Sequence, residues 1–436
     1  MFTKKSVNDW DISGKRVLLR ADYNVPVDQG VIVDDYRIKQ SLPTIRLILE
    51  RAGSLIIVSH LGRPDGQANP ALSLRPVSKR LSELLEKEVH FAADCVGEKV
   101  QKAAEGLEPG GVLVLENVRF HPEEEKNDQA FAKEIVKATG AEIFVQDGFG
   151  VVHRAHATTD AIAKLLPAVA GPLLEKEVDT ITNVMQSPQR PLLAIVGGAK
   201  ISDKIDILNR LIEIADSVAV AGAMANNFLL ASDISVGKSL VEVEKEVLTT
   251  AQQILQKARS AEQSRKFSFL VPVDAVVSTA IDGTKPTRVV DLSSNSLADI
   301  EAYPRVPPLS AHTLGADESI FDIGPISAGT IAGAVKLAST VVWNGTCGVT
   351  ETKGLAGAAD PFSHGTRLVM DAMIGDSNHH VNRPFTLVGG GDTAGYVESM
   401  GLAADFNHVS TGGGAFLELM SGKNLPGVEV LWNKDG

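Results

Sequence analysis

The stretch PFTLVGGGDTAG, residues 384–395, places three consecutive glycines between an apolar run and a polar one. Thr386–Val388 is typical of the end of a buried strand, Gly389–Gly391 of a tight turn, and Asp392 of the first turn of a helix. A helix N-terminus exposes backbone N–H groups and the positive end of the helix dipole, so the stretch predicts a phosphate site. The spacing Gly389-x-Gly391-x-x-Ala394 fits a dinucleotide-binding fingerprint as well as one half of a kinase site, and the stretch alone leaves both open.

Composition narrows the class of protein. The chain has 436 residues, 44% of them hydrophobic and 22% charged, which is close to an average soluble globular protein of two or three domains. The net charge of −12 argues against a nucleic-acid-binding surface. The two cysteines, Cys95 and Cys347, lie far apart, as expected in the reducing cytosol. Without a signal core or a run of ~18 apolar residues, we expect a cytoplasmic protein with no membrane partner and no nucleic-acid partner.

In the first half, short apolar runs alternate with helical patterns, and each run ends in polar residues. The expected strands are Val17–Leu19, Leu55–Val58, Val112–Leu115 and Glu142–Val145. The expected helices are Ile38–Arg51, a helix capped by Ser73, and a helix from Asp128 to Gly140. This alternation predicts a parallel α/β sheet, in which ligands bind beyond the carboxyl ends of the strands.

Basic side chains follow these strand ends or precede the first helix, and we expect them to converge. They are Arg20, Arg37, His60, Arg63, Arg119, His153, Arg154 and His156. Such a cluster in an acidic protein repels itself unless an anion neutralises it, and arginine binds carboxylate or phosphate in a bidentate fashion. The pattern therefore predicts an anion site. Metal binding by His153 and His156 is not expected, because no acidic or cysteine partner lies beside them in the sequence.

A helix at 171–186 is expected to connect this half to a second α/β half. The strands expected there are Leu192–Val196, Val218–Ala221, Phe269–Val271 and Val341–Trp343, with helices from Met224 and over Val241–Arg259, and loops over 283–319. Backbone amides can approach phosphate at three glycine loops, 197–198, 389–391 and 412–414. Lys200 and Lys204 could follow a transferring phosphoryl group, or form a solvated helix face. Asp392 could hold Mg²⁺, or simply cap a helix.

Two absences bear on the chemistry. The sequence contains no Walker motif GxxxxGK[ST] and no obvious general base beside a nucleophile. An acceptor that is itself a carboxylate or a phosphate is already ionised at neutral pH, so positioning and charge neutralisation are enough to transfer a phosphoryl group to it.

Taken together, these motifs resemble the phosphoglycerate kinase family. The matching stretches are collinear and are RADYNVP (20–26), SHLGRP (59–64), LENVRFH (115–121), HRAH (153–156), GGAKISDK (197–204), WNG (343–345), GGGDT (389–393) and STGGGA (410–415). The resemblance implies an α/β architecture of two doubly wound parallel-sheet (Rossmann-like) domains joined by a helical hinge. It implies a phosphoglycerate-binding domain at 1–170, the hinge helix at 171–187, a nucleotide-binding domain at 188–405, and a C-terminal segment at 406–436 that returns toward the first domain.

The implied reaction is reversible phosphoryl transfer from 1,3-bisphosphoglycerate to Mg-ADP, giving 3-phosphoglycerate and ATP in glycolysis and gluconeogenesis. A monomer is implied, with a hinge that closes over the substrates.

The resemblance also implies site residues. Those that match its substrate contacts or complete the basic patch are Arg20, Asp22, Asn24, Arg37, His60, Arg63, Arg119, His153, Arg154 and His156. Those that match its nucleotide contacts are Gly198, Lys200, Lys204, Asn344, Glu351, Gly390, Gly391, Asp392 and Thr393. Among them, the expected catalytic residues are Arg37, Lys200 and Lys204. Glu351 is expected to bind the ribose hydroxyls, and Asp392 is expected to approach Mg²⁺, the cofactor that accompanies ADP or ATP.

The sequence departs from the family pattern on the nucleotide side. The changed positions are Ala221 and Ile320, where the family has or favours glycine, and Thr346, Cys347 and Thr350, in place of a proline, an apolar residue and a phenylalanine. We expect these changes to affect adenine packing and nucleotide affinity and not the reaction class. The loops 283–319 and 376–384 are longer than the family pattern requires.

Two other functions remain open from the residues. A flavin- or nicotinamide-dependent oxidoreductase would explain GGGDTA, but it needs an N-terminal dinucleotide fingerprint and often a CxxC pair, and the sequence has neither. A non-catalytic nucleotide-binding relative would keep the fold and lose the chemistry, although every charged residue that the resemblance implies is present.

Overall fold

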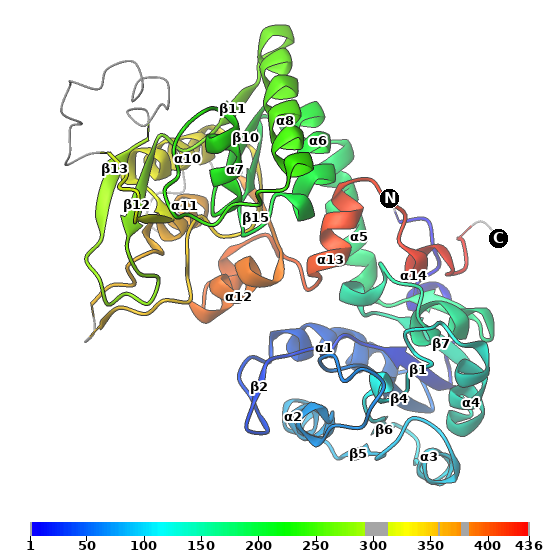
Figure 1. Cartoon of the computed structure of the whole chain (residues 1–436). Coiled ribbons are helices and arrows are strands. Elements are labelled where there is room, and N and C mark those ends of the chain that lie inside the picture. The colour runs from blue at the N-terminus through cyan, green and yellow to red at the C-terminus, as the bar shows by residue number, and fades with distance from the viewer. Residues whose placement is uncertain (1, 293–312, 356–357, 376–382, 435–436) are drawn as a thin grey trace, which may run out of the picture. The chain divides into compact units, whose positions relative to one another are not determined.

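A computed structural model describes residues 2–292, 313–355, 358–375 and 383–434. The chain forms two compact units: unit 1 is Met1–Thr182 together with Thr411–Gly436, and unit 2 is Asn183–Ser410. The boundary at 182–183 falls within the long helix α5 (Pro172–Gln186). Each unit is built on a six-stranded parallel sheet with helices packed against it (Figure 1), which confirms the predicted fold class. The predicted domains stay predictions, because each of them assigns a role to a range of residues. These ranges are 1–170, 171–187, 188–405 and 406–436.

The sheet of unit 1 has the strand order β5-β6-β4-β1-β7-β8, and all neighbours are parallel. Its strands are β1 (Arg16–Arg20), β4 (Ser54–Val58), β5 (Val89–Phe91), β6 (Gly111–Val114), β7 (Ile143–Gln146) and β8 (Ala168–Ala170). Its helices before α5 are α1 (Tyr36–Leu49), α2 (Arg75–Leu85), α3 (Glu98–Glu105) and α4 (Gln129–Thr139). Arg20 pairs in register with Val58 and with Gln146, so the polar segments that follow β1, β4 and β7 leave the sheet at one edge.

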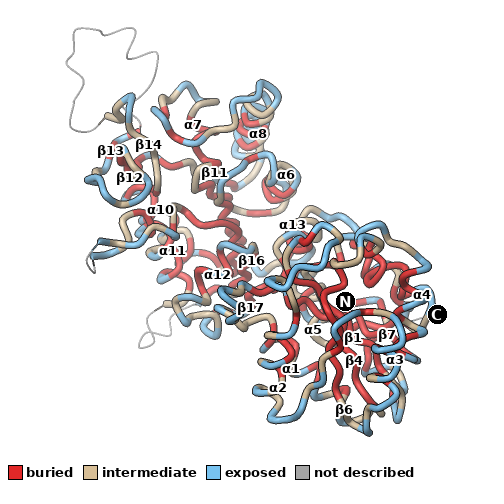
Figure 2. The backbone as a smooth tube through the Cα atoms, turned by 60° about the horizontal axis from the view of Figure 1, so that its bottom comes forward, coloured by how far each residue is buried: buried red, intermediate tan, exposed pale blue. Residues whose placement is uncertain are grey.

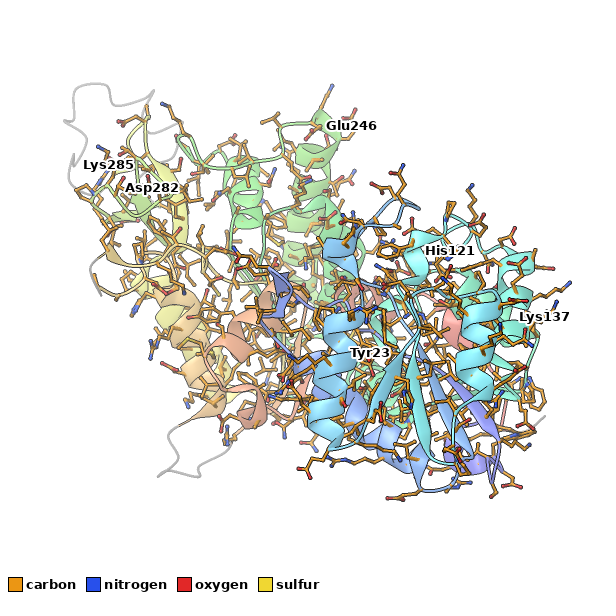
Figure 3. The ribbon with its side chains drawn as sticks, turned by 90° about the horizontal axis from the view of Figure 1, so that it is seen from below. Tyr23, His121, Lys137, Glu246, Asp282 and Lys285 are labelled. Carbon is orange, nitrogen blue, oxygen red and sulfur yellow. The ribbon has the colours of Figure 1, made fainter. Side chains whose placement is uncertain are left out.

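The strands of unit 1 form its core. All five residues of β4 are buried, as expected for a parallel strand covered on both faces. Figure 2 shows the strands as buried segments surrounded by more exposed helices and loops. On the outside of the unit, Lys137 of α4 is exposed (Figure 3). Tyr23, just after β1, is instead fully buried, and its hydroxyl lies 3.0 Å from Oγ of Ser41. The loop that follows β1 is therefore anchored in the core.

A local capping signal explains where α4 begins, whereas the signal predicted for α2 is not used. The side chain of Asp128 accepts a hydrogen bond from the backbone N–H of Phe131 at 2.8 Å, and α4 ends at Gly140 with a φ of +60°, as predicted. The predicted cap at Ser73 is wrong by one residue, because Leu74 occupies the N-cap position of α2. The hydroxyl of Ser73 instead donates to the carboxylate of Glu116 at 2.7 Å.

The last part of the chain packs into unit 1. It contains α13 (Gly413–Met420) and α14 (Pro426–Glu429). The backbone N–H of Trp432 donates to the carbonyl of Ala168 in β8 at 3.0 Å, and Lys4 forms an isolated antiparallel bridge with Asn433. The backbone and the hydroxyl of Thr411 both donate to the buried carboxylate of Glu177, at 2.7 and 2.8 Å. Both ends of the chain therefore belong to the same unit.

The main sheet of unit 2 has the order β11-β10-β9-β15-β16-β17, again all parallel. Its strands are β9 (Leu192–Val196), β10 (Ser217–Val220), β11 (Ser268–Leu270), β15 (Thr340–Asn344), β16 (Phe385–Gly389) and β17 (His408–Val409). Its helices are α6 (Ile205–Ile214), α7 (Met224–Ala231), α8 (Lys245–Ser264), α10 (Pro325–Leu337), α11 (His364–Ile374) and α12 (Gly391–Ser399). The strand order reverses between β9 and β15, and ligands of doubly wound sheets bind beyond the strands at such a point.

A second, antiparallel sheet was not predicted. It has the order β13-β12-β14 and consists of β12 (Asp274–Ser278), β13 (Arg288–Asp291) and β14 (Ser319–Ile323). The prediction of loops over 283–319 is thus wrong at β13 and at Ser319, where β14 begins. Residues 293–312 lie outside the described residues, as do 376–382 with His379 and His380. The two short strands β2 (Val27–Asp28) and β3 (Val31–Ile32) form a hairpin in unit 1.

Helix α8 begins at Lys245 and not at Val241 as predicted. The side chain of Asn227 explains the shift: its Nδ2 donates to the carbonyl of Glu242 at 2.8 Å, and its Oδ1 accepts the N–H of Glu242 at 3.3 Å. These bonds hold the segment before α8 out of helical geometry. Within the described ranges, no helix combines the length and the apolar character that crossing a membrane would need.

Candidate substrate and nucleotide sites

The predicted anion site of unit 1 lies at the carboxyl ends of β1 and β4. Asp22 and Asn24 follow β1, and Arg37 lies in the first turn of α1. Nη1 of Arg37 lies 3.3 Å from both carboxylate oxygens of Asp22 and 3.0 Å from the carbonyl oxygen of Asn24. The side chain of Asn24 accepts the N–H of Gly62 at 2.8 Å. The structure thus brings the segments after β1 and β4 together with the start of α1.

The arginines of this site differ in how far they reach the surface. Arg154 and Arg63 are exposed, and Arg37 is partly buried. Arg119 is largely buried: its Nη1 donates to the carbonyl of Gly62 at 2.9 Å, and burial lowers its pKa. The accessible positive charge of the site therefore comes from arginines on separate segments, two on loops and Arg37 on α1.

Arg20 lies beneath this surface. It is only 1% exposed, its Nε donates to Oγ1 of Thr158 at 2.9 Å, and its Nη2 lies 3.3 Å from Nδ1 of His60. A guanidinium with these internal partners supports the loops that follow the strands, and it has little surface to offer a ligand.

The three histidines do not add charge. Burial and the neighbouring charge of Arg20 hold the pKa of His60 well below its ordinary value. Burial and the charges of Arg119 and Arg20 lower the pKa of His156 to about 4. Burial and Arg154 also lower the pKa of His153, whose Nε2 accepts a hydrogen bond from Nε of Arg154 at 3.1 Å. All three are neutral hydrogen-bonding groups at pH 7, so the site is basic through its arginines alone.

In unit 2, Asn344 connects the loops of the predicted nucleotide site. It ends β15 and is 1% exposed. Its Oδ1 accepts a hydrogen bond from Nζ of Lys204, and its Nδ2 donates to the carbonyl of Gly389 at 2.9 Å. The first glycine loop, the end of β15 and the 389–391 loop are therefore joined through one amide side chain.

Glycine is required at two places in this framework. Gly390 has a φ of +99°, and a Cβ there would lie 2.8 Å from Nδ2 of Asn344. Gly345 has a φ of +94°, and a Cβ there would lie 2.2 Å from the backbone of Gly197. The N–H of Gly345 donates to Oγ1 of the buried Thr393 at 2.6 Å, so Thr393 positions the loop from inside.

A pocket opens beside this framework. Among the predicted nucleotide residues, Gly198, Glu351 and Asp392 line it, and Glu351 and Asp392 are exposed. Its apolar wall includes Leu229, Leu240, Ile281 and Ile320. Gly391 and Lys200 are exposed on the neighbouring loops. A polar mouth with an apolar wall suits a ligand that has a charged end and an aromatic end.

Lys204 has an unusual environment. Burial lowers its pKa to about 8, and the nearby carboxylate of Asp392 works in the opposite direction. The ammonium group is therefore partly desolvated before any ligand binds, which makes an anionic partner favourable. The carboxylate of Asp392, at the start of α12, is accessible. It fits Mg²⁺, which takes one or two protein carboxylates and completes its coordination with phosphates and water.

The structure explains one departure from the family pattern, at Ala221, and locates two others, Cys347 and Ile320. Ala221 is fully buried and has no left-handed φ, whereas Gly222 has a φ of +65° and a Cβ there would lie 2.7 Å from the N of Gly198. Glycine is thus needed only at the second position of the pair. Cys347 is buried and its carbonyl accepts the N–H of Gly222 at 3.0 Å, while Ile320 lines the pocket directly.

Sequence reasoning missed part of the pocket. Asn226 of α7 and Asp322 of β14 line it, and neither was predicted. Asn226 lies four residues after Gly222, so the glycine turn before α7 was a usable signal. No comparable signal existed for Asp322, because the strand that carries it was not recognised.

Comparison with known proteins decides the family. The model of the phosphoglycerate kinase family matches residues 7–423. The chain belongs to the phosphoglycerate kinase family. A phosphoglycerate kinase from Pelotomaculum thermopropionicum is 43% identical over 431 residues, covering 99% of this chain and all of that protein. One from Chloroflexus aurantiacus is 45% identical, with 98% of each chain covered.

The fold agrees with this family. The structure of phosphoglycerate kinase from Coxiella burnetii aligns with a TM-score of 0.77 at 36% identity, covering 98% of each chain. Because phosphoglycerate kinases match 98–99% of the chain, both halves predicted from the sequence belong to one enzyme of this family. The comparisons assign no role to individual residues, and those roles are inferred from the contacts of each side chain.

Proposed function

We propose that this chain catalyses reversible phosphoryl transfer from 1,3-bisphosphoglycerate to ADP, giving 3-phosphoglycerate and ATP. The family match over residues 7–423 carries this conclusion. It is supported by the charged groups that the reaction needs: an arginine-rich surface in unit 1, and glycine loops with a desolvated lysine in unit 2.

In unit 1, Arg37 is the group best suited to act on the phosphoryl group. It is partly accessible and is aimed by Asp22 and Asn24. Arg63, Arg119 and Arg154 would neutralise the phosphoglycerate, with His60, His153 and His156 as neutral hydrogen-bonding groups. Asp22 and Asn24 would hold the arginine and the substrate hydroxyl in place. No general base is required, because the carboxylate acceptor of the reverse reaction is already ionised.

In unit 2, Lys204 and Lys200 would follow the phosphoryl charge, and the amides of Gly198, Gly390 and Gly391 would face the phosphates. Glu351 would bind the ribose hydroxyls at the mouth of the pocket. Mg²⁺ would be held by Asp392 and the nucleotide, where it would neutralise the phosphate oxygens. Asn344 and Thr393 would act as positioning residues, because their side chains are buried and bonded within the framework.

A coupled assay tests the proposal directly. The purified chain is given 1,3-bisphosphoglycerate with Mg-ADP or Mg-GDP, and formation of the nucleoside triphosphate is measured. Nucleotide binding without ATP formation would favour a non-catalytic relative. A nicotinamide-dependent absorbance change without ATP formation would favour an oxidoreductase. We further propose that the enzyme is a cytoplasmic monomer and that its activity depends on Mg²⁺. Light scattering measures the oligomeric state, and activity after chelation of Mg²⁺ measures the metal dependence.

A further inference from the structure

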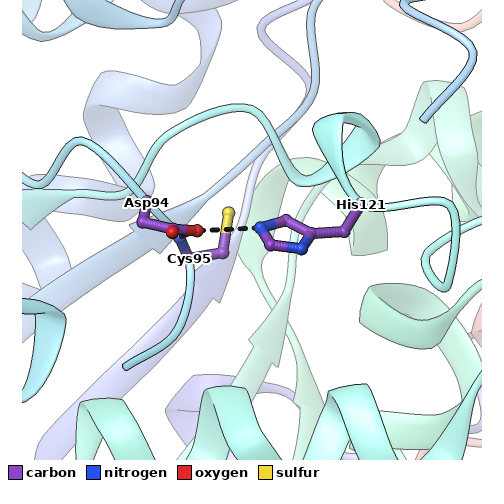
Figure 4. Close-up of side chains that lie close together, drawn as sticks. All are labelled: Asp94, Cys95 and His121. Carbon is purple, nitrogen blue, oxygen red and sulfur yellow. Dashed lines mark hydrogen bonds and ion pairs between the residues drawn. The ribbon is translucent and has the colours of Figure 1, made fainter. Parts of the chain in front are cut away.

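Three side chains of types that can bind a metal ion lie close together in unit 1, and the proposed reaction does not use them. Asp94 and Cys95 follow β5, and His121 follows the 3₁₀ turn Val118–Phe120. One ligand atom from each residue lies within 4.8 Å of the other two. Figure 4 shows the three side chains directed toward one another from two separate loops.

We propose that Asp94, Cys95 and His121 form a binding site for Zn²⁺, separate from the Mg²⁺ that accompanies the nucleotide. Thiolate, imidazole and carboxylate are the ligands that zinc takes in proteins, and three of them leave a fourth position for water. With bonds of 2.0–2.3 Å, tetrahedral ligands stand about 3.3–3.8 Å apart, so small side-chain movements bring all three to one ion.

The geometry around the cluster favours this use. Nε2 of His121 lies 2.8 Å from Oδ1 of Asp94, so the two atoms face each other, and a metal ion bound by both would replace this hydrogen bond. The His121 ring packs on Phe131 with centroids 4.8 Å apart, which restricts its rotation. Oδ1 of Asp94 also accepts the N–H of Cys95 at 2.7 Å, which orients the carboxylate. Ordered ligands lose less conformational entropy when a metal ion binds.

The electrostatic environment favours a cation. Cys95 is fully buried, and its thiol donates to the carbonyl of Glu116 at 2.9 Å. The carboxylates of Asp94, Glu116 and Glu124 lie close enough to act on this thiol electrostatically, and the charge of Arg20 opposes them. The same carboxylates attract a divalent ion, which displaces the thiol proton to solvent as the zinc–sulfur bond forms. Asp94 is exposed and His121 is partly exposed, so solvent can reach the site.

Occupancy would connect to the substrate surface. Arg119 lies two residues before His121, in the 3₁₀ turn Val118–Phe120 that follows β6. Its guanidinium donates a hydrogen bond to the carbonyl of Gly62. A zinc ion would join this turn to the Asp94 loop and restrict its movement. This coupling is a consequence of the site, and the site itself does not depend on the proposed catalytic roles.

Zinc binding by the full, reduced and chelator-treated chain tests the proposal, using competition with a chromophoric chelator. We expect one Zn²⁺ per chain, and an affinity lowered about tenfold or more by Cys95→Ser and by His121→Gln. The matched controls are Cys347→Ser, which removes the other buried cysteine, and His90→Gln, an exposed histidine of β5; both should keep the wild-type affinity.

Cadmium gives a second readout, because a thiolate–cadmium bond has a charge-transfer band in the ultraviolet. The band should be lost in Cys95→Ser and kept in Cys347→Ser. His121→Gln, at a partly exposed position, guards against misfolding of the buried cysteine variant, and circular dichroism checks each protein. Failure of the wild type to bind zinc, or equal zinc affinity in the wild type and His121→Gln, would overturn the proposal.

Discussion

Nη1 of Arg37 lies 3.3 Å from both oxygens of the Asp22 carboxylate and donates to the carbonyl of Asn24 at 3.0 Å. The Asp22 side chain is buried, whereas a quarter of the Arg37 side chain is exposed. The guanidinium is therefore held on its inner side and open on its outer side, so it is positioned to meet an anion without losing its internal partner.

This arrangement predicts the result of removing the guanidinium. Arg37→Ala should lower turnover by about a thousandfold, because one arginine on developing phosphoryl charge can be worth that much. Arg46→Ala, at an exposed arginine in the last turn of the same helix, is the matched control and should keep wild-type turnover. Steady-state kinetics in the coupled assay measure both. Wild-type turnover in Arg37→Ala would remove this residue from the mechanism.

Lys204 should be needed for phosphoryl transfer in unit 2. Lys204→Ala removes the ammonium group that bonds to Asn344 and leaves the nucleotide phosphates without a buried positive charge. We expect activity to collapse with both ADP and GDP, since the lysine is proposed to act on the phosphates, which both nucleotides share. Lys137→Ala, at an exposed lysine of α4, is the control (Figure 3). Unchanged turnover in Lys204→Ala would refute the assignment of the nucleotide site.

The environment of Lys204 also predicts a pH dependence. Its pKa is lowered to about 8 by burial, so the free enzyme loses this charge as pH rises through about 8. Nucleotide phosphates favour the charged form, so ADP binding should weaken above that pH and should take up a proton. Calorimetry in buffers of different ionisation enthalpy measures the proton. Lys204→Arg keeps its charge and should bind ADP without this uptake; equal uptake in both proteins would contradict the assignment.

The 389–391 loop can be tested with two substitutions in the same segment. Gly390→Ala forces a side chain onto a φ of +99° and against Nδ2 of Asn344, so it should disturb the bond to Lys204 and raise the KM for ADP about tenfold or more. Gly395→Ala places its methyl group in open space on α12 and should be neutral or slightly stabilising. If both variants show the wild-type KM, the loop does not bind the nucleotide.

Asp147 predicts a pH-dependent stability. Its Oδ1 accepts the N–H groups of Leu173 and Leu174 at the start of α5, at 3.0 and 3.1 Å. Burial nevertheless raises its pKa from 3.8 to about 7. A raised folded-state pKa stabilises the protein at low pH, and this contribution is lost as pH rises from 3.8 through about 7.

Asparagine imitates the protonated carboxyl group, so Asp147→Asn should increase the free energy of unfolding near pH 8 more than near pH 5. Urea denaturation of wild type and variant at both pH values measures the difference. The same change in stability at both pH values would show that Asp147 does not titrate in this range.

The sequence predicted the parallel sheets because they rest on local patterns, and the same patterns supplied the candidate site residues, whose roles stay predictions. Buried strands such as Leu192–Val196 are continuous apolar runs, and the polar residues that follow them mark the ligand edge of the sheet. The capping residues Asp128 and Gly140 allowed both ends of α4 to be predicted correctly.

What could not be predicted depends on residues far apart in the chain. β13 is short and set within a polar segment, and it is a strand only because it pairs with β12. The start of α8 depends on Asn227, which holds the preceding segment extended. The neutral state of His60 follows from burial beside Arg20, and the approach of His121 to Asp94 needs the folded sheet. None of these leaves a periodic signal in the sequence.

The pairing of Trp432 with β8 and of Thr411 with Glu177 has a consequence for biosynthesis. Unit 2 is continuous in the chain, whereas unit 1 needs residues 411–436, which a ribosome adds after all of unit 2. Domains usually fold in the order of their synthesis. Unit 1 is therefore begun before unit 2 and completed after it. Unit 2 folds while β8 still lacks the C-terminal segment that bonds to it.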